Sequence, residues 1–174
     1  SKELTKEQRN EWEKVKGRIK EISFNEPVEQ LIRLAANYIT EKMKMSFDVS
    51  EERLKDLTRI IRNSNLVNVA SIGEDIVEQI LPLDLLSSSI LVQSLQRYGQ
   101  NERSLFSFLT SKDPYSLRSL GPLPNKFFHV ESVYNYISHN FFSFINSKYN
   151  PDFSKWSAIK TSIEKIYGRF TDKV

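Results

Sequence analysis

Residues 82–109 read PLDLLSSSILVQSLQRYGQNERSLFSFL and predict two helices joined by a short turn. Asp84 is suited to cap the first helix, because its carboxylate can accept a hydrogen bond from a free amide of the first turn. Gly99 is expected to end that helix in the left-handed conformation that glycine adopts without strain. Residues at three- and four-residue spacing then form one helix face: Leu86, Ile90, Leu91, Ser94, Leu95 and Tyr98.

The second helix of this hairpin is apolar on most sides. Asn101 is expected to cap it, and Leu105, Phe106, Phe108 and Leu109 follow closely. A short helix with so much apolar surface is expected to be buried, so Phe106 is assigned to the core with its neighbours. Ser87, Ser88 and Ser89, in the first helix, are small enough to let another helix approach closely.

Four polar residues, Gln100, Asn101, Glu102 and Arg103, lie between these two apolar helices. In the simplest interpretation the stretch is a packed helix pair with a polar turn. The alternatives are a buried hydrogen-bond network, or a surface that faces a ligand or a neighbouring domain. These four residues are therefore candidate site residues.

Composition limits the class of protein. The chain has 174 residues, 39% hydrophobic and 27% charged, with a formal net charge of +3. This length allows one domain with a substantial core or two small helical subdomains. The absence of cysteine excludes disulfides and cysteine-based metal sites, and it favours a cytoplasmic protein. No apolar run approaches the length of a membrane span, so no membrane partner is expected.

Helices are also expected before the hairpin, over residues 4–22, 27–43 and 50–63. Thr5 and Gln8 form a capping-box pattern at the start of the first. On the third, Lys55, Arg59 and Arg62 share an outer face and make the best basic patch of the chain. Such a face is usually just solvated; nucleic-acid binding is the alternative, and it normally needs more charges and stacking aromatics.

After the hairpin, residues 111–125 are rich in proline and glycine and predict a loop. An aromatic helix of about five turns is expected from Phe127, and Asn150-Pro151 should separate it from a last amphipathic helix that Asp152 or Ser154 can cap. We therefore predict an all-α fold of about seven or eight helices. The predicted division is a helical lid or spacer subdomain at 1–110, a linker at 111–125 and a C-terminal helical subdomain at 126–174.

No catalytic constellation is visible. The chain lacks the glycine-rich phosphate loop that ends in Gly-Lys-Ser/Thr and the Gly-x-Ser-x-Gly elbow. His129 and His139 do not have the close spacing of a metal-binding pair, and both are expected to be partly buried or at the surface. Carboxylates mostly have lysines three or four residues away, which is ordinary surface pairing. These patterns predict neither an enzyme nor a metal site.

The string GQNERSLFSFL at 99–109 resembles a motif of large bacterial P-loop ATPases of the AAA+/STAND-like kind, many of them associated with phage defence. PLDLL at 82–86 takes the place of the Pro-Leu-rich helix before that motif, although Asp84-Leu85 departs from the usual His-Pro. Upstream, Trp12-x-x-x-x-Gly17-Arg18 and FNEPVEQL at 24–31 look like the segment after the nucleotide-binding core. Downstream, VYNY at 133–136 looks like the aromatic helix of those proteins.

The resemblance implies a non-catalytic helical regulatory or lid module of a larger ATPase, with the Walker motifs before Ser1. Such a module would couple nucleotide state to an effector or partner. Its partners would be the ATPase core or neighbouring protein domains, and ATP and magnesium would bind elsewhere in the parent, leaving no cofactor in this segment. Arg18 or Arg103 would then lie near the nucleotide or at a subunit interface, where a planar guanidinium suits phosphate or carboxylate contacts.

Overall fold

A computed structural model of the chain describes residues 5–16, 26–43, 49–64, 68–73, 75–99, 102–120 and 127–171. These residues are mostly helical, and none of the described residues forms a strand, so the predicted all-α fold is confirmed. The seven longer helices of the described residues are α1 (Lys6–Lys16), α2 (Val28–Tyr38), α3 (Glu51–Ser64), α6 (Leu85–Tyr98), α7 (Glu102–Thr110), α8 (Val130–Asn140) and α10 (Phe153–Thr171). The short elements are η1 (Ile39–Met43), a π-helix; α4 (Val69–Ile72); α5 (Ile76–Gln79); η2 (Leu117–Leu120), a 3-10 helix; and α9 (Phe142–Ile145).

Two of the predicted helix starts are confirmed by their capping hydrogen bonds. The Thr5 hydroxyl accepts from the Gln8 amide at 3.3 Å, while the Gln8 side chain accepts from the Thr5 amide at 3.0 Å. The Asp84 carboxylate accepts from the Ser87 amide at 2.6 Å. Both caps satisfy amides that the helix itself leaves without a partner.

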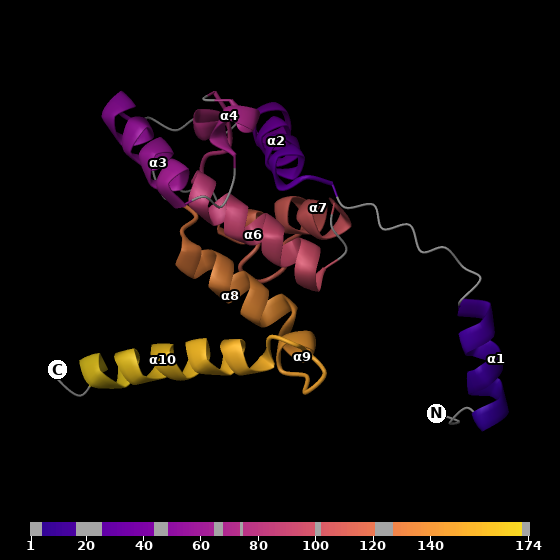
Figure 1. Cartoon of the computed structure of the whole chain (residues 1–174). Coiled ribbons are helices and arrows are strands. Elements are labelled where there is room, and N and C mark those ends of the chain that lie inside the picture. The colour runs from indigo at the N-terminus through magenta and orange to yellow at the C-terminus, as the bar shows by residue number, and fades with distance from the viewer. Residues whose placement is uncertain are drawn as a thin grey trace.

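Helix α6 lies at the centre of the fold. It contacts α2, α3, α7 and α8, and Figure 1 shows these helices gathered around it. Three consecutive serines of α6, Ser87, Ser88 and Ser89, are all buried, and the Ser88 hydroxyl donates to the Leu85 carbonyl at 3.1 Å. The close helix approach that these small side chains are expected to allow stays a prediction.

Gly99 ends α6, but its conformation differs from the predicted one. Its backbone is extended, with φ −110° and ψ −156°, so the left-handed assignment was wrong. The glycine is required for another reason: a Cβ atom at this position would lie 2.5 Å from the Ser104 hydroxyl and 2.8 Å from the Leu95 carbonyl oxygen. Close packing of the α6–α7 turn, rather than a positive φ, excludes a side chain here.

Helix α7 buries only one side. Phe108 is fully buried, with its ring centroid 5.1 Å from that of Phe128 and 4.9 Å from that of Tyr136. Phe106 is 39% exposed and meets Tyr38 edge-on at 6.2 Å. The assignment of Phe106 to the core was therefore wrong, because α7 lies at the edge of the helical body and turns that residue outward.

The long aromatic helix expected from Phe127 is divided into α8 and α9 at Phe141. Residues on both sides of the 111–125 stretch contribute to one hydrophobic cluster, including Leu91 of α6, Phe108 of α7 and Ile137 of α8. The backbone joins the two parts as well, because the Phe128 amide donates to the Pro82 carbonyl at 2.8 Å. The proposed division into subdomains stays a prediction.

The first and last helices differ from the rest in placement. Helix α1 lies apart from the other helices, and α10 runs out from the body below α8 (Figure 1). Within the described part of the chain, none of the helices combines the length and the apolar character that crossing a membrane requires.

Candidate functional site

The end of α6 and the start of α10 meet in a compact polar cluster, which we call the α6–α10 junction: Arg97, Tyr98, Asp152, Lys155 and Trp156. Asp152 is 5% exposed, and its carboxylate accepts from the Arg97 guanidinium, from the Tyr98 hydroxyl at 3.2 Å and from the Lys155 ammonium at 3.2 Å. The hydrogen bond from Arg97 holds the pKa of Asp152 below its ordinary value and raises the pKa of Arg97. The junction therefore keeps a charged carboxylate at its centre at neutral pH.

Aromatic rings pack against one another at this junction. The Trp156 indole nitrogen donates to the Tyr98 hydroxyl at 2.9 Å, and the two ring centroids lie 5.8 Å apart. Tyr134 of α8 stacks on Trp156 at 6.1 Å, and Phe144 of α9 lies 5.7 Å from Tyr98. Rings from α6, α8, α9 and α10 thus hold the first turns of α10 against the body.

The connector between α9 and α10 positions Asp152. Asn150 is buried, and its side-chain amide donates to the Ile145 carbonyl at 3.2 Å. Its side-chain oxygen accepts from the Asp152 amide at 3.0 Å. This local turn, followed immediately by α10, directs the Asp152 carboxylate toward α6. The sequence predicted the break at Asn150-Pro151, and the structure adds that Asn150 builds the turn.

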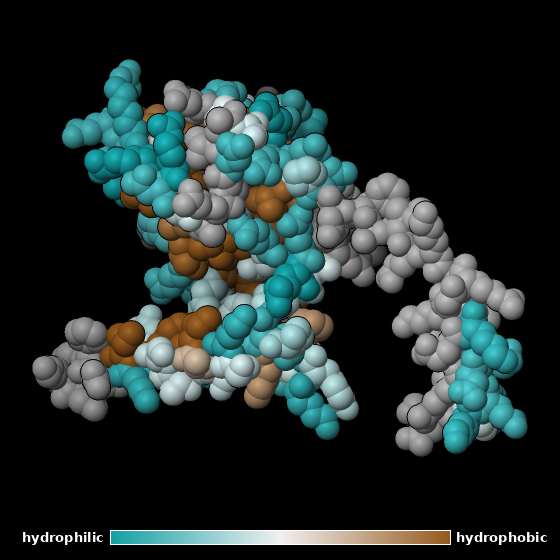
Figure 2. All heavy atoms as spheres, in the orientation of Figure 1, coloured by the Kyte–Doolittle hydropathy of each residue, from teal (hydrophilic) through white to brown (hydrophobic). Residues whose placement is uncertain are grey.

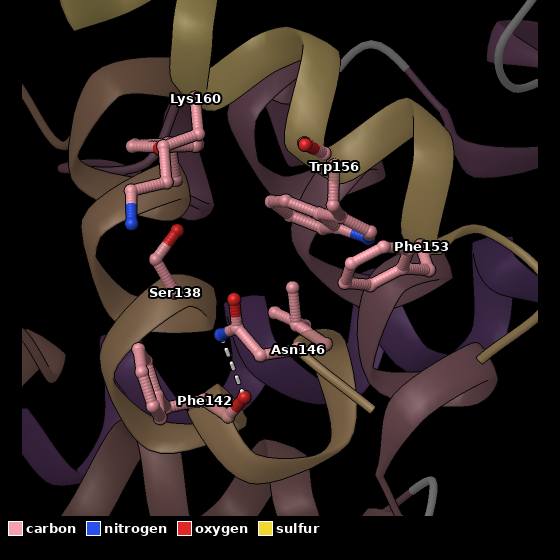
Figure 3. A pocket seen from close by; sticks show the side chains of 9 residues that line it. Ser138, Phe142, Asn146, Phe153, Trp156 and Lys160 are labelled. Carbon is pink, nitrogen blue, oxygen red and sulfur yellow. Dashed lines mark hydrogen bonds between the residues drawn. The ribbon is translucent and has the colours of Figure 1, made fainter. Parts of the chain in front are cut away.

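A cleft of about 230 Å³ opens beside the junction, between α8, α9 and α10 (Figure 3). Lys160 and Ser138 point toward one another across it, while the side-chain amide of Asn146 donates to the Phe142 carbonyl at 2.9 Å. Its walls combine aromatic rings with a few polar groups; the lining residues are Tyr134, Ser138, Phe142, Ile145, Asn146, Phe153, Trp156, Ser157 and Lys160.

Beyond the junction, α10 leaves apolar side chains uncovered. Ile159 is 45% and Ile166 is 55% exposed, whereas Trp156, which precedes both on the same helix, is packed against the body. Figure 2 shows hydrophobic side chains along this projecting helix, with open space between it and the body. The N-terminal turns of α10 are thus attached to the body, while its C-terminal part keeps an apolar surface that is free to contact another molecule.

Most of the predicted nucleotide-sensing or interface residues lie outside the described part of the chain. Arg18, Gln100 and Asn101 lie outside the described residues. Glu102 and Arg103 form the start of the α7 backbone, but their side chains are outside the described part as well. Their proposed roles therefore stay predictions.

The predicted basic patch does lie on one exposed face of α3. Lys55, Arg59 and Arg62 line a shallow depression of about 270 Å³ together with Thr58. Lys55 pairs with Glu51 at 3.7 Å and Arg59 pairs with Asp56 at 2.9 Å. Acidic neighbours one turn away therefore offset part of the positive charge of this face.

Sequence reasoning missed the α6–α10 junction as a unit. Asp152 was assigned only as a possible cap, and Tyr98 only as a position on an apolar helix face. Arg97 and Asp152 are 55 positions apart, and no local pattern links them. The available signal was indirect: a tyrosine and a tryptophan on amphipathic helices carry polar atoms that need partners when buried.

Neither metal ligation nor similarity to known proteins assigns a function. Among the described residues, no three histidine, aspartate or glutamate side chains are grouped so that they could hold a metal ion. His129 and His139 are both exposed. Of the two predicted positions, partly buried or at the surface, the structure shows the second. No family model, curated protein or solved structure matches the chain. A functional assignment must therefore come from the geometry of the junction and of α10.

Proposed function

We propose that this chain is a non-catalytic helical regulatory module of a larger P-loop ATPase, and that it passes a nucleotide-dependent movement to a partner through α10. The observation that supports this proposal best is the α6–α10 junction. Arg97 and Tyr98 are the last two residues of α6, and they hold Asp152 and Trp156 at the base of a 19-residue helix. A displacement of the α6 end is therefore transmitted to α10.

The position of the junction connects it to the ATPase-like motif. Gly99 follows Tyr98 directly and opens the string at 99–109 that resembles the ATPases. Because a side chain at Gly99 would collide with Ser104 and with the Leu95 carbonyl, the end of α6 and the start of α7 are closely packed. A movement of α7 relative to α6 would therefore act on Arg97 and Tyr98, and through them on α10.

A non-catalytic role agrees with how the buried carboxylates are used. Among the described residues, the buried acidic side chains are Asp84 and Asp152. Asp84 caps α6, and Asp152 accepts hydrogen bonds from Arg97, Tyr98 and Lys155. The lowered pKa of Asp152 suits a structural ion pair rather than a general acid at neutral pH.

The test uses the complete polypeptide encoded by the gene that contains this chain. Spin labels are attached to cysteines introduced at Asn63 of α3 and Thr161 of α10, both exposed, with any cysteine elsewhere replaced by serine. We expect the complete polypeptide to hydrolyse ATP and the label-to-label distance to differ between ADP and a non-hydrolysable ATP analogue. Asp152→Asn should abolish that difference, while Glu164→Gln, an exposed acid-to-amide change on the same helix, should preserve it.

Two results would overturn the proposal. One is a complete polypeptide that neither binds nor hydrolyses ATP. The other is a distance between α3 and α10 that is the same in both nucleotide states, because α10 would then not respond to the nucleotide.

Nucleic-acid binding through α3 is the second candidate. Lys55, Arg59 and Arg62 share one exposed depression, which supports it. The pairing of Lys55 with Glu51 and of Arg59 with Asp56 makes the face a weaker anion site than three unpaired cations would be. Binding that falls steeply with added salt and is lost in Arg59→Gln would favour this candidate.

A further inference from the structure

The cleft between α8, α9 and α10 has aromatic walls. Tyr134 and Trp156 stack on each other at 6.1 Å with an interplanar angle of 27°, and both are half-buried. Phe142 of α9 and Phe153 of α10 also line the opening, and they are 59% and 42% exposed. A planar ring that enters the cleft would cover both exposed rings and meet them in the stacked or edge-on contacts that aromatic groups favour.

Polar groups converge in the same space. The Lys160 side chain of α10 and the Ser138 side chain of α8 point toward one another across the cleft (Figure 3). The Ser138 hydroxyl makes no hydrogen bond to any of the described residues, whereas the Ser162 hydroxyl of α10 donates to the Ala158 carbonyl at 2.8 Å, as serines within helices often do. The ammonium and the Ser138 hydroxyl can therefore donate together to a group that enters the cleft.

The positive charge of Lys160 is only weakly offset. Its ion-pair partner is Glu164, at 4.0 Å, and the two side chains are 61% and 65% exposed. A long and exposed pair of this kind contributes little free energy, so an anion in the cleft can compete with it. Among the described residues that line the cleft, none is acidic. The cleft therefore favours an anionic group over a neutral or cationic one.

The size of the cleft limits the ligand. Its volume of about 230 Å³ is below the range of about 300–1,000 Å³ that is usual for sites of drug-sized molecules. A single ring with a short acidic arm is the kind of molecule that fits.

We propose that this cleft binds a small aromatic acid. The ring of the ligand packs among Trp156, Phe142 and Phe153, and its carboxylate or phosphate accepts hydrogen bonds from Lys160 and Ser138. The inference goes beyond the proposed function and does not depend on it, because binding requires no nucleotide. A ligand that contacts α8 and α10 together would also strengthen the attachment of α10 to the body.

The test follows the indole N–H signals of the two tryptophans by NMR in the ¹⁵N-labelled chain. Trp156 lines the cleft, whereas Trp12 belongs to α1, which lies apart from the other helices; Trp12→Phe assigns the signals. We expect 4-hydroxyphenylacetate to shift the Trp156 signal with a Kd of roughly 1 mM. The neutral 4-hydroxyphenylacetamide should bind at least about threefold more weakly, because it cannot form a charge-assisted hydrogen bond with the ammonium.

Two further probes separate the parts of the ligand. Cyclohexylacetate has the acid without the aromatic ring, and it should bind more weakly than 4-hydroxyphenylacetate. Phenyl phosphate has the ring with the other kind of anion. If it binds more tightly than 4-hydroxyphenylacetate, the natural ligand is assigned to aromatic phosphates, and if it binds more weakly, to aromatic carboxylates.

Matched variants test the role of Lys160. Lys160→Met should bind the acid and the amide alike, whereas Lys165→Met, the same change at an exposed position of α10 outside the cleft, should keep the preference for the acid. Glu164→Gln removes the competing carboxylate, so it should bind the acid at least as tightly as the natural chain does. Circular dichroism and thermal unfolding check that each variant keeps the fold.

Three results would overturn the inference. The first is a Trp156 signal that 4-hydroxyphenylacetate does not shift. The second is equal affinity of the natural chain for this acid and either its amide or cyclohexylacetate. The third is the same preference for the acid in Lys160→Met and Lys165→Met. None of these results bears on whether α10 responds to a nucleotide, so the proposed regulatory function is tested separately.

Discussion

The indole nitrogen of Trp156 donates a 2.9 Å hydrogen bond to the hydroxyl of Tyr98, which lies 58 positions earlier in the chain. The same hydroxyl donates to Asp152 at 3.2 Å. Tyr98 therefore connects the ring that anchors α10 with the carboxylate that begins it. The attachment of α10 to the body depends on this one polar atom as well as on ring packing.

Tyr98→Phe tests that attachment. The ring contacts remain, but Trp156 loses its acceptor and Asp152 loses one donor. We expect a loss of about 1–2 kcal/mol in the free energy of unfolding, measured by urea denaturation. Tyr149→Phe is the control, because Tyr149 is 83% exposed and its hydroxyl should contribute little. Equal stability of the two variants would show that the hydrogen bonds of Tyr98 are unimportant.

Two phenylalanines of α7, two positions apart, should differ strongly in their contribution to stability. Phe108→Ala removes a fully buried ring that meets Phe128 and Tyr136, and it should cost about 3–5 kcal/mol. Phe106→Ala removes a ring that is 39% exposed, and it should cost roughly 1 kcal/mol. Thermal unfolding of the matched pair measures the difference, and equal costs would contradict the described orientation of α7.

Acidification should release α10 before the rest of the fold unfolds. The Arg97 hydrogen bond lowers the pKa of Asp152 in the folded state, so this carboxylate stabilises the fold at pH values above its unfolded pKa of about 3.9. That contribution is lost as the pH falls from about 4 through the lowered folded pKa. Arg97, Tyr98 and Lys155 are the groups that face the carboxylate.

Tryptophan fluorescence of a Trp12→Phe variant, in which Trp156 is the remaining tryptophan, follows this release. In Asp152→Asn the emission should lose its dependence on pH over that range. An unchanged acid transition in Asp152→Asn would assign the effect to other carboxylates.

Alkaline pH should destabilise the core through Tyr136. Burial, together with the charge of Asp113, raises the pKa of Tyr136 to about 12. Since the folded pKa exceeds the unfolded value of about 10, the stabilising contribution is complete below pH 10 and is lost as the pH rises toward 12. The loss should be about 2–3 kcal/mol.

Tyr136→Phe has no proton to lose, so it should unfold at higher pH than the natural chain does. Tyr149→Phe is the matched control, because it removes the same hydroxyl from a side chain that is exposed rather than buried. If both variants have the alkaline midpoint of the natural chain, Tyr136 does not control this transition.

The sequence by itself determined the features that depend on neighbours within one or two helical turns. The caps at Thr5 and Asp84, the end of α6 at Gly99, and the break at Asn150-Pro151 were all predicted, because each depends on residues close along the chain. The all-α class was predicted for the same reason, since apolar spacing and caps report local helix formation.

Only the tertiary structure decided which helical faces meet. From the sequence, Phe106 and Phe108 look equally suited to the core, because α7 is apolar on most sides. The position of α7 at the edge of the body buries Phe108 and exposes Phe106. Arg97 and Asp152 pair across 55 positions because α10 begins beside the end of α6. Such a contact depends on how helices cross, and a sequence pattern with a period of one helical turn carries no information about that crossing.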